Sequence, residues 1–219
     1  MTEPIILAIE SSGTICSISL TERNKLIAEY SAYITNSHDR LLSEYVNRIL
    51  PDFNLKITDI HAVAVSAGPG SFTGLRIGAA LAKGLCFGNS PKFIAVPTLE
   101  AVAEQACNLT NCSFYDQIVV AIPSHKDNIY IQTFNTDSSP LTEVLTSTMD
   151  VLNSFNAEKT LFLCQQNLKP QDSRWLNISE ILNASTIARK AVSLYLNSTF
   201  TDAKSFTPTY ILDFVPKEV

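Results

Sequence analysis

Residues 66–78 read Ser-Ala-Gly-Pro-Gly-Ser-Phe-Thr-Gly-Leu-Arg-Ile-Gly, and they lie between a short apolar run and a helical pattern. Gly68 and Gly70 flank Pro69 and permit a tight turn that most side chains would obstruct. The stretch therefore predicts a strand-to-helix turn, which could be structural or could hold an anion on exposed N–H groups. It matches neither the dinucleotide-binding fingerprint nor the Walker A loop.

The helix that follows this turn has a stripe of small residues. Ser71 or Thr73 can accept hydrogen bonds from the free N–H groups of its first turn. Gly74, Gly78 and Ala82 then recur every four residues, which places them on one face of the helix. We expect another segment of backbone to approach closely along this stripe.

Upstream of the turn, the sequence predicts three strands and one helix. The strands cover residues 5–9, 14–20 and 26–31 and are separated by short polar turns, as in an antiparallel meander. The helix covers residues 39–50 and has apolar side chains at helical spacing, namely Leu41, Leu42, Tyr45, Val46 and Ile49.

Downstream, a strand at 61–66, the helix 73–87, a strand at 93–96 and a helix at 99–107 complete the order β-β-β-α-β-α-β-α. This order is that of one half of the actin, hexokinase and Hsp70 superfamily, an α/β, ribonuclease H-like architecture. A second, reduced lobe should follow, with strands at 118–123, 128–135, 143–148 and 160–164 and a helix at 184–196. We expect an N-terminal lobe at residues 1–106 and a smaller C-terminal lobe at residues 107–219.

The composition limits the classes of function. The net charge is −5 and the basic residues are scattered singly, so the chain itself has no predicted footprint for nucleic acid or polyphosphate. The five cysteines lie mostly in apolar segments, as reduced thiols do. No apolar run is long enough to cross a membrane and no export signal is recognised, so we expect a cytoplasmic protein.

The glycine-rich turn also carries a resemblance to a known family. The stretch from Gly68 to Arg76, followed by Gly78, Ala82, Lys83 and Gly84, resembles the signature of the TsaB (YeaZ) family. The residues of the signature turn are Gly68, Pro69, Gly70, Ser71, Phe72 and Thr73. Further similarity occurs at residues 6–12, at His38 with Leu41 and Leu42, and at Pro208-Thr209-Tyr210-Ile211-Leu212.

The resemblance implies a fold and a set of partners. It implies an actin-like ATPase fold and pairing with the catalytic subunit TsaD, which the small ATPase TsaE joins. That complex transfers a threonylcarbamoyl group to N6 of the adenosine beside the anticodon, in tRNAs that read codons beginning with A. This chain would be the non-catalytic, activating subunit, would contact tRNA only through the complex, and would pair with itself when alone.

Several expected catalytic groups are absent from the sequence. The catalytic relative uses two histidines four residues apart, whereas Leu42 follows His38 at that spacing. Glu10 stands where an ATPase of this fold has an aspartate, which weakens a Mg²⁺ site without excluding it. No glycine follows Gly88, although a second phosphate turn would require glycine. We therefore predict no catalytic, metal-binding or cofactor-binding residues.

Two rival functions remain to be separated from the subunit hypothesis. One is an ATP-dependent small-molecule kinase or ATPase, which would need retained metal and nucleotide residues. The other is a peptidase, but Ser124, His125 and Asp127 are too close in sequence for a triad and indicate a polar hairpin turn. For the subunit hypothesis, the resemblance places the partner interface on the two helices, at Leu41, Leu42, Tyr45, Val46, Ile49, Gly74, Gly78 and Ala82.

Overall fold

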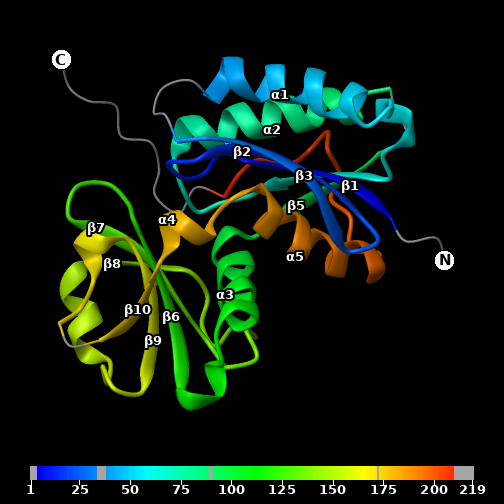
Figure 1. Cartoon of the computed structure of the whole chain (residues 1–219). Helices are drawn as coiled ribbons and strands as arrows, with labels where there is room; N and C mark the ends of the chain where they lie inside the picture. Colours follow the sequence, from blue (N-terminus) through cyan, green and yellow to red (C-terminus); the bar gives the residue numbers. More distant parts are fainter. Residues whose placement is uncertain (1–3, 34–37, 89–90, 172, 210–219) are drawn as a thin grey trace, which may run out of the picture.

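The computed structural model describes residues 4–33, 38–88, 91–171 and 173–209, in which the strands form two five-stranded sheets (Figure 1). The first sheet has the order β3-β2-β1-β4-β5. Its strands are β1 (Ile5–Glu10), β2 (Cys16–Glu22), β3 (Lys25–Ala32), β4 (Ala62–Ser66) and β5 (Lys92–Val96). β1, β2 and β3 are antiparallel, whereas β4 and β5 are parallel to β1, as the meander and crossover pattern predicts.

The second sheet repeats this topology. Its strands are β6 (Gln117–Pro123), β7 (Asn128–Phe134), β8 (Leu145–Thr148), β9 (Thr160–Cys164) and β10 (Arg174–Asn177). Read as β8-β7-β6-β9-β10, the order and the directions match those of the first sheet. The short helical turns η3 (Met149–Ser154) and η4 (Gln166–Leu168) stand where the first lobe has long crossover helices. The predicted fold, two similar lobes with the second reduced, is therefore confirmed.

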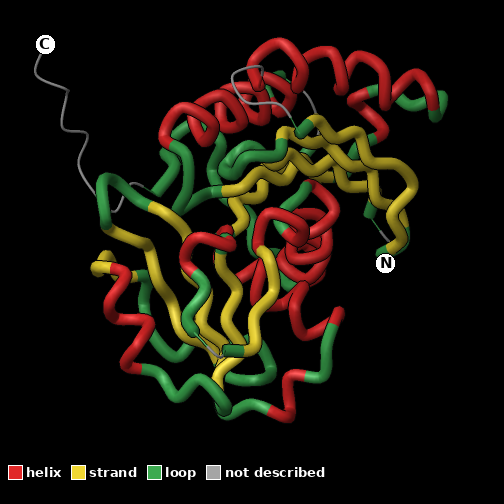
Figure 2. Tube along the Cα trace, turned by 60° about the vertical axis from the view of Figure 1, so that its left-hand side comes forward, coloured by secondary structure: helices red, strands yellow, loops and turns green. Residues whose placement is uncertain are grey.

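Helices cover both faces of the first sheet. α1 (His38–Asp52) and α2 (Phe72–Cys86) lie side by side on one face, and α5 (Ala184–Leu196) covers the other (Figures 1 and 2). α1 is amphipathic. Leu42, Val46 and Ile49 recur on one face of the helix at helical spacing, and this face is buried against the sheet. The short turn η1 (Ile57–Asp59) then leads into β4.

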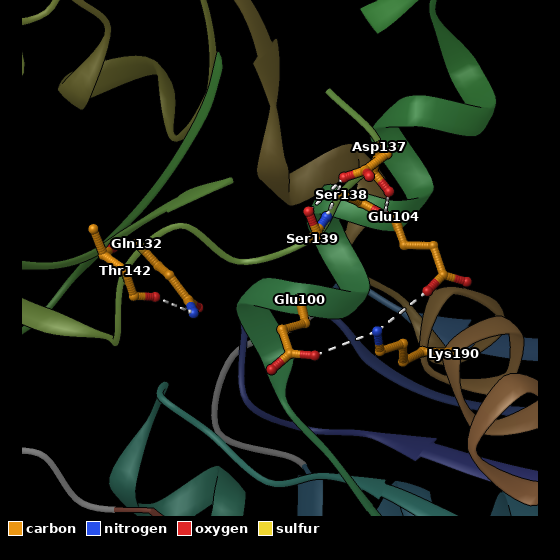
Figure 3. A network of polar contacts seen from close by, with 8 residues as sticks. All are labelled: Glu100, Glu104, Gln132, Asp137, Ser138, Ser139, Thr142 and Lys190. Atoms are coloured by element: carbon orange, nitrogen blue, oxygen red, sulfur yellow. Dashed lines mark hydrogen bonds and ion pairs between the residues drawn. The ribbon is translucent and has the colours of Figure 1, made fainter. Parts of the chain in front are cut away.

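A helical layer lies between the two sheets. α3 (Thr98–Leu109) and α5 pack against each other there (Figure 2). Their apolar side chains join residues of both sheets in one buried cluster. Lys190 of α5 contacts Glu100 and Glu104 of α3 at 3.3 and 3.4 Å, as Figure 3 shows. The short η2 (Cys112–Phe114) and α4 (Ile178–Ile181) complete the elements.

Two features differ from the expectations drawn from the sequence. α5 packs chiefly on β1 and β2, so residues 184–196 pack with the N-terminal lobe although they fall within the predicted unit 107–219. β10 was not predicted, because Arg174–Asn177 is only four residues long and lacks a buried alternation. In the part of the chain that the structure describes, no helix is both long and apolar enough to span a bilayer.

Candidate functional site

A cavity of about 520 Å³ opens between the two lobes. The first lobe contributes the turn after β1 and the start of α2, and the second contributes the end of β6, the residue after β9 and α4. Its lining residues are Ser12, Gly13, Thr14, Gly70, Ser71, Thr73, Gly74, Ile77, Ile122, Pro123, Gln165, Ile178, Ser179 and Leu182. Among these described residues, none has an ionisable side chain, so the walls offer hydroxyl, amide and apolar groups.

Glu10 lies at the end of β1, beneath the turn that lines this cavity. Its side chain is fully buried, and Oε1 accepts hydrogen bonds from Ser12 N at 2.5 Å, Ser12 Oγ at 2.6 Å and Gly13 N at 3.1 Å. Burial raises the pKa of the Glu10 carboxyl, and the bonds from Ser12 and Gly13 oppose that rise. The carboxyl group therefore accepts hydrogen bonds from the turn that follows it, and it is not part of the cavity lining.

The turn after β1 interlocks with the start of α2. Ser71 N donates to Ser12 O at 2.8 Å, and Ser11 Oγ donates to Gly74 O at 2.9 Å. Ser71 is the N-cap of α2, because its hydroxyl accepts from Gly74 N at 3.3 Å. Of the two predicted caps, the structure thus selects Ser71.

The glycines of the signature turn allow this close approach. A Cβ on Gly70 would lie 2.7 Å from Ser12 O, and one on Gly74 would lie 1.9 Å from Ser11 O. Gly78 would place a Cβ 2.3 Å from the Ser11 hydroxyl. The predicted close packing along this stripe is confirmed, and the neighbouring backbone belongs to the same chain.

The signature turn is also tied to the C-terminal segment. Gly68 has a φ of +103° and follows β4, and a Cβ there would lie 2.8 Å from Thr209 O. Thr209 N donates to Ala67 O at 2.8 Å, which holds the segment against the turn. Of the predicted C-terminal motif, Tyr210, Ile211 and Leu212 lie outside the described residues.

The groups that line the cavity limit what it could hold by way of a phosphate group or a metal ion. Four backbone N–H groups that could face a phosphate, those of Ser12, Gly13, Ser71 and Gly74, already donate within the chain. In the described ranges, no three His, Cys, Asp or Glu side chains gather as a metal ion would require. A Mg²⁺–triphosphate group would therefore find no charged side chain in the described lining of the cavity, and these four N–H groups are already engaged.

The structure also locates the Ser124, His125 and Asp127 segment and His61. Ser124, His125 and Asp127 lie in the turn between β6 and β7, where Ser124 N donates to Asn128 O at 2.9 Å, so the predicted hairpin turn is confirmed. His61 precedes β4, and its Nδ1 accepts from Ile5 N at 3.1 Å. Neither histidine lines the cavity.

The structure buries most of the predicted partner residues within the chain. Leu42, Val46 and Ile49 are buried against the chain's own sheet, so they are core residues. Gly74, Gly78 and Ala82 are also buried within the chain, and the two glycines meet the turn after β1. These six residues are packed within the chain, because the helical period identifies the buried stripe of each helix, and of the predicted interface residues only Leu41 and Tyr45 keep exposed surface.

The two helices retain other apolar side chains that are only partly buried. Leu41 and Tyr45 of α1 stay half-buried, as do Leu81 and Leu85 of α2, which the sequence reading missed. We call Leu41, Tyr45, Leu81 and Leu85 the α1–α2 face. Their spacing of four residues on each helix was the available signal, but only the packing shows which stripe points outward.

Comparison with known proteins now bears on identity. The model of the family described as TsaD, tRNA N6-adenosine threonylcarbamoyltransferase, matches residues 27–161. The protein named tRNA threonylcarbamoyladenosine biosynthesis protein TsaB from Bacillus subtilis (strain 168) is 37% identical over 98 residues, covering 45% of this chain and 43% of its own length. The protein of the same name from Escherichia coli (strain K12) is 31% identical over 134 residues, covering 61% and 56%.

The chain belongs to the TsaB (YeaZ) family. It spans about half the length of the curated relatives it matches. The structure of YeaZ from Pseudomonas aeruginosa superposes with a TM-score of 0.81 at 20% identity, covering 96% of this chain and 100% of that one. A putative N-acetylmannosamine kinase from Listeria monocytogenes reaches a TM-score of 0.50 at 14% identity, covering 89% and 99%, which indicates a shared actin-like fold alone.

Proposed function

We propose that this TsaB-family chain is a non-catalytic, activating subunit in the biosynthesis of threonylcarbamoyladenosine in tRNA. Its partner would be a TsaD-type subunit that carries out the transfer to N6 of the adenosine beside the anticodon, in tRNAs reading codons that begin with A. The names of the relatives supply the pathway, since they are called tRNA threonylcarbamoyladenosine biosynthesis proteins. The chemistry of the interlobe cavity supports the non-catalytic role.

The observation that carries the proposal is the chemistry of the interlobe cavity. Its lining holds no ionisable side chain among the described residues, and the carboxyl group of Glu10, at the end of β1, is bonded inward to Ser12 and Gly13. Phosphoryl transfer depends on metal ions and cationic groups that neutralise phosphate charge. These properties of the cavity favour a subunit that assists a catalytic partner over an enzyme that transfers phosphoryl groups itself.

The α1–α2 face supports the proposed pairing. Leu41, Tyr45, Leu81 and Leu85 are apolar side chains on two adjacent helices, and each is only partly buried against the core of the first sheet. Half-exposed apolar side chains on neighbouring helices suit a helical partner that covers them. In the absence of that partner, the same face would pair with a second copy around a two-fold axis.

The proposal assigns RNA binding and ATP hydrolysis to other subunits. The chain has a net charge of −5 with its basic residues scattered, so tRNA would be held through the assembled complex. A TsaE-type ATPase would supply nucleotide hydrolysis. The alternative of an ATP-dependent kinase or ATPase finds no carboxylate, among the described residues of the cavity lining, that would hold a phosphate-bound metal.

The test is a reconstitution with purified components. A TsaD-type subunit of the same organism, a TsaE-type ATPase, substrate tRNA and the threonylcarbamoyl donor are assayed for transfer with and without this chain. We expect transfer to depend on the chain, and we expect the chain alone to hydrolyse no ATP. Transfer at the same rate without it, or Mg²⁺-dependent ATP turnover by the chain alone, would refute the proposal.

A further inference from the structure

We propose that Glu10 is a positioning residue that fixes the start of α2, and with it the α1–α2 face, through the turn after β1. The effect on pairing rests on the proposed function, whereas the effect on α2 can be measured on the isolated chain. Glu10 does not line the interlobe cavity, so this role is separate from any chemistry in the cleft.

The first link is the carboxyl oxygen that organises the turn. Glu10 Oε1 accepts three hydrogen bonds, two from Ser12 and one from Gly13, and thereby folds residues 11–13 back over the end of β1. The side chain is fully buried, so its removal leaves the N–H groups of the turn without their acceptor in the protein. One side chain thus determines the conformation of the turn.

The second link joins the turn to the helix. Ser12 O accepts from Ser71 N, the N-cap residue, and Ser11 Oγ donates to Gly74 O in the first turn of α2. Contact is closest at Gly74, where a Cβ would lie 1.9 Å from Ser11 O. A shift of the turn therefore moves the hydrogen-bonded groups at the start of α2 directly.

The third link carries the position of the helix to the surface. α2 is 15 residues long and packs on β4 and against α1, so its start and the side chains of Leu81 and Leu85 belong to one rigid element. A change in the first turn therefore alters how α2 lies beside α1. Buried packing of this kind transmits small displacements because cores are close-packed.

The experiment uses the full chain with Glu10→Gln, Glu10→Ala and Ser11→Ala. Glutamine keeps the oxygen that accepts from Ser12 and Gly13, and alanine removes it. Ser11→Ala removes only the bond to Gly74 O and serves as a milder variant if Glu10→Ala fails to fold. Amide hydrogen exchange is followed in residues 72–78, with α5 as an internal reference, and affinity for a TsaD-type subunit is measured by sedimentation.

We expect Glu10→Ala to speed exchange in residues 72–78 by about tenfold or more, since it removes three net-stabilising hydrogen bonds. Ser11→Ala should produce a smaller increase in the same residues, Glu10→Gln should produce none, and α5 should exchange unchanged throughout. Glu10→Ala should also weaken pairing with the TsaD-type subunit. If Glu10→Ala does not fold, an increase confined to residues 72–78 in Ser11→Ala supports the proposal.

Exchange in residues 72–78 that is unchanged in both Glu10→Ala and Ser11→Ala would overturn the proposal, as would an increase spread equally over α5. Faster exchange with unchanged affinity would overturn the link from Glu10 to the α1–α2 face. Failure of the wild type itself to pair would instead refute the proposed function, and the exchange data would still decide the role of Glu10.

Discussion

Gly74 and Gly84 lie in the same helix, and alanine at the two positions should have opposite effects on stability. A Cβ at Gly74 would lie 1.9 Å from Ser11 O, far inside the 3.0 Å that real Cβ contacts respect. A Cβ at Gly84 would meet nothing within 4 Å. Alanine at position 74 forces two backbone segments apart, whereas alanine at position 84 fills open space. Comparing the two variants therefore distinguishes the effect of packing on stability from the effect of helix propensity.

The magnitudes follow from these contacts. Overpacking of a tight site costs about 1–3 kcal/mol or more, and at Gly74 the obstacle is backbone that cannot rotate away. Separation would also weaken the bonds from Ser11 Oγ to Gly74 O and from Ser71 N to Ser12 O, each worth about 1 kcal/mol. We expect Gly74→Ala to destabilise by about 3 kcal/mol, and Gly84→Ala to stabilise by about 0.5–1 kcal/mol through helix propensity.

Urea and thermal unfolding of the two variants beside the wild type provide the assay. For a chain of this size, about 3 kcal/mol corresponds to a fall in Tm of about 6–12 °C, and Gly84→Ala should raise Tm by a few degrees. Equal shifts for the two variants, or no loss in Gly74→Ala, would refute the interlock between the turn after β1 and α2.

Two further predictions concern buried charge. Lys190→Met should destabilise by about 1 kcal/mol, because it leaves the largely buried Glu100 and Glu104 without their cation, and adding Glu100→Gln with Glu104→Gln should recover that loss in urea unfolding. Burial raises the pKa of Glu10 above its ordinary value of 4.5, so its contribution to stability is full below that pH and is lost as pH rises through the folded-state pKa. The stability of the wild type relative to Glu10→Gln should therefore fall with rising pH over that window, and a difference that is flat or rises would contradict the inward, buried position of Glu10.

The sequence predicts local structure well where short-range chemistry decides it. The meander, the turn at Gly68 and the helix capped at Ser71 follow from residue types within a few positions, and the structure has all three. Four of the five strands of the second sheet lie at predicted positions, whereas the short β10 was not predicted. The sequence alone therefore predicts the fold class.

Long-range packing could not be read in the same way. The period of α1 identifies a stripe containing Leu42 and Ile49, but it cannot say whether a sheet or a partner covers that stripe. The attachment of α5 to β1, and the inward bonds of Glu10, depend on contacts between residues far apart or on one side-chain rotamer. A glutamate at the end of a strand before Ser-Ser-Gly was the available signal, since such a turn offers N–H groups to a nearby carboxyl.

The central claim, that this chain acts by pairing through the α1–α2 face, is tested most directly by sedimentation with a TsaD-type subunit of the same organism. Leu81→Lys places a charge on that face, and Leu196→Lys is the matched control on α5, where the leucine is 57% exposed on the opposite side of the sheet. With both variants folded by thermal melt, we predict that the control pairs like the wild type. Leu81→Lys should weaken pairing by about 100-fold or more, because an unpaired charge in an apolar interface costs several kcal/mol. A folded Leu81→Lys variant that pairs with wild-type affinity would contradict the account.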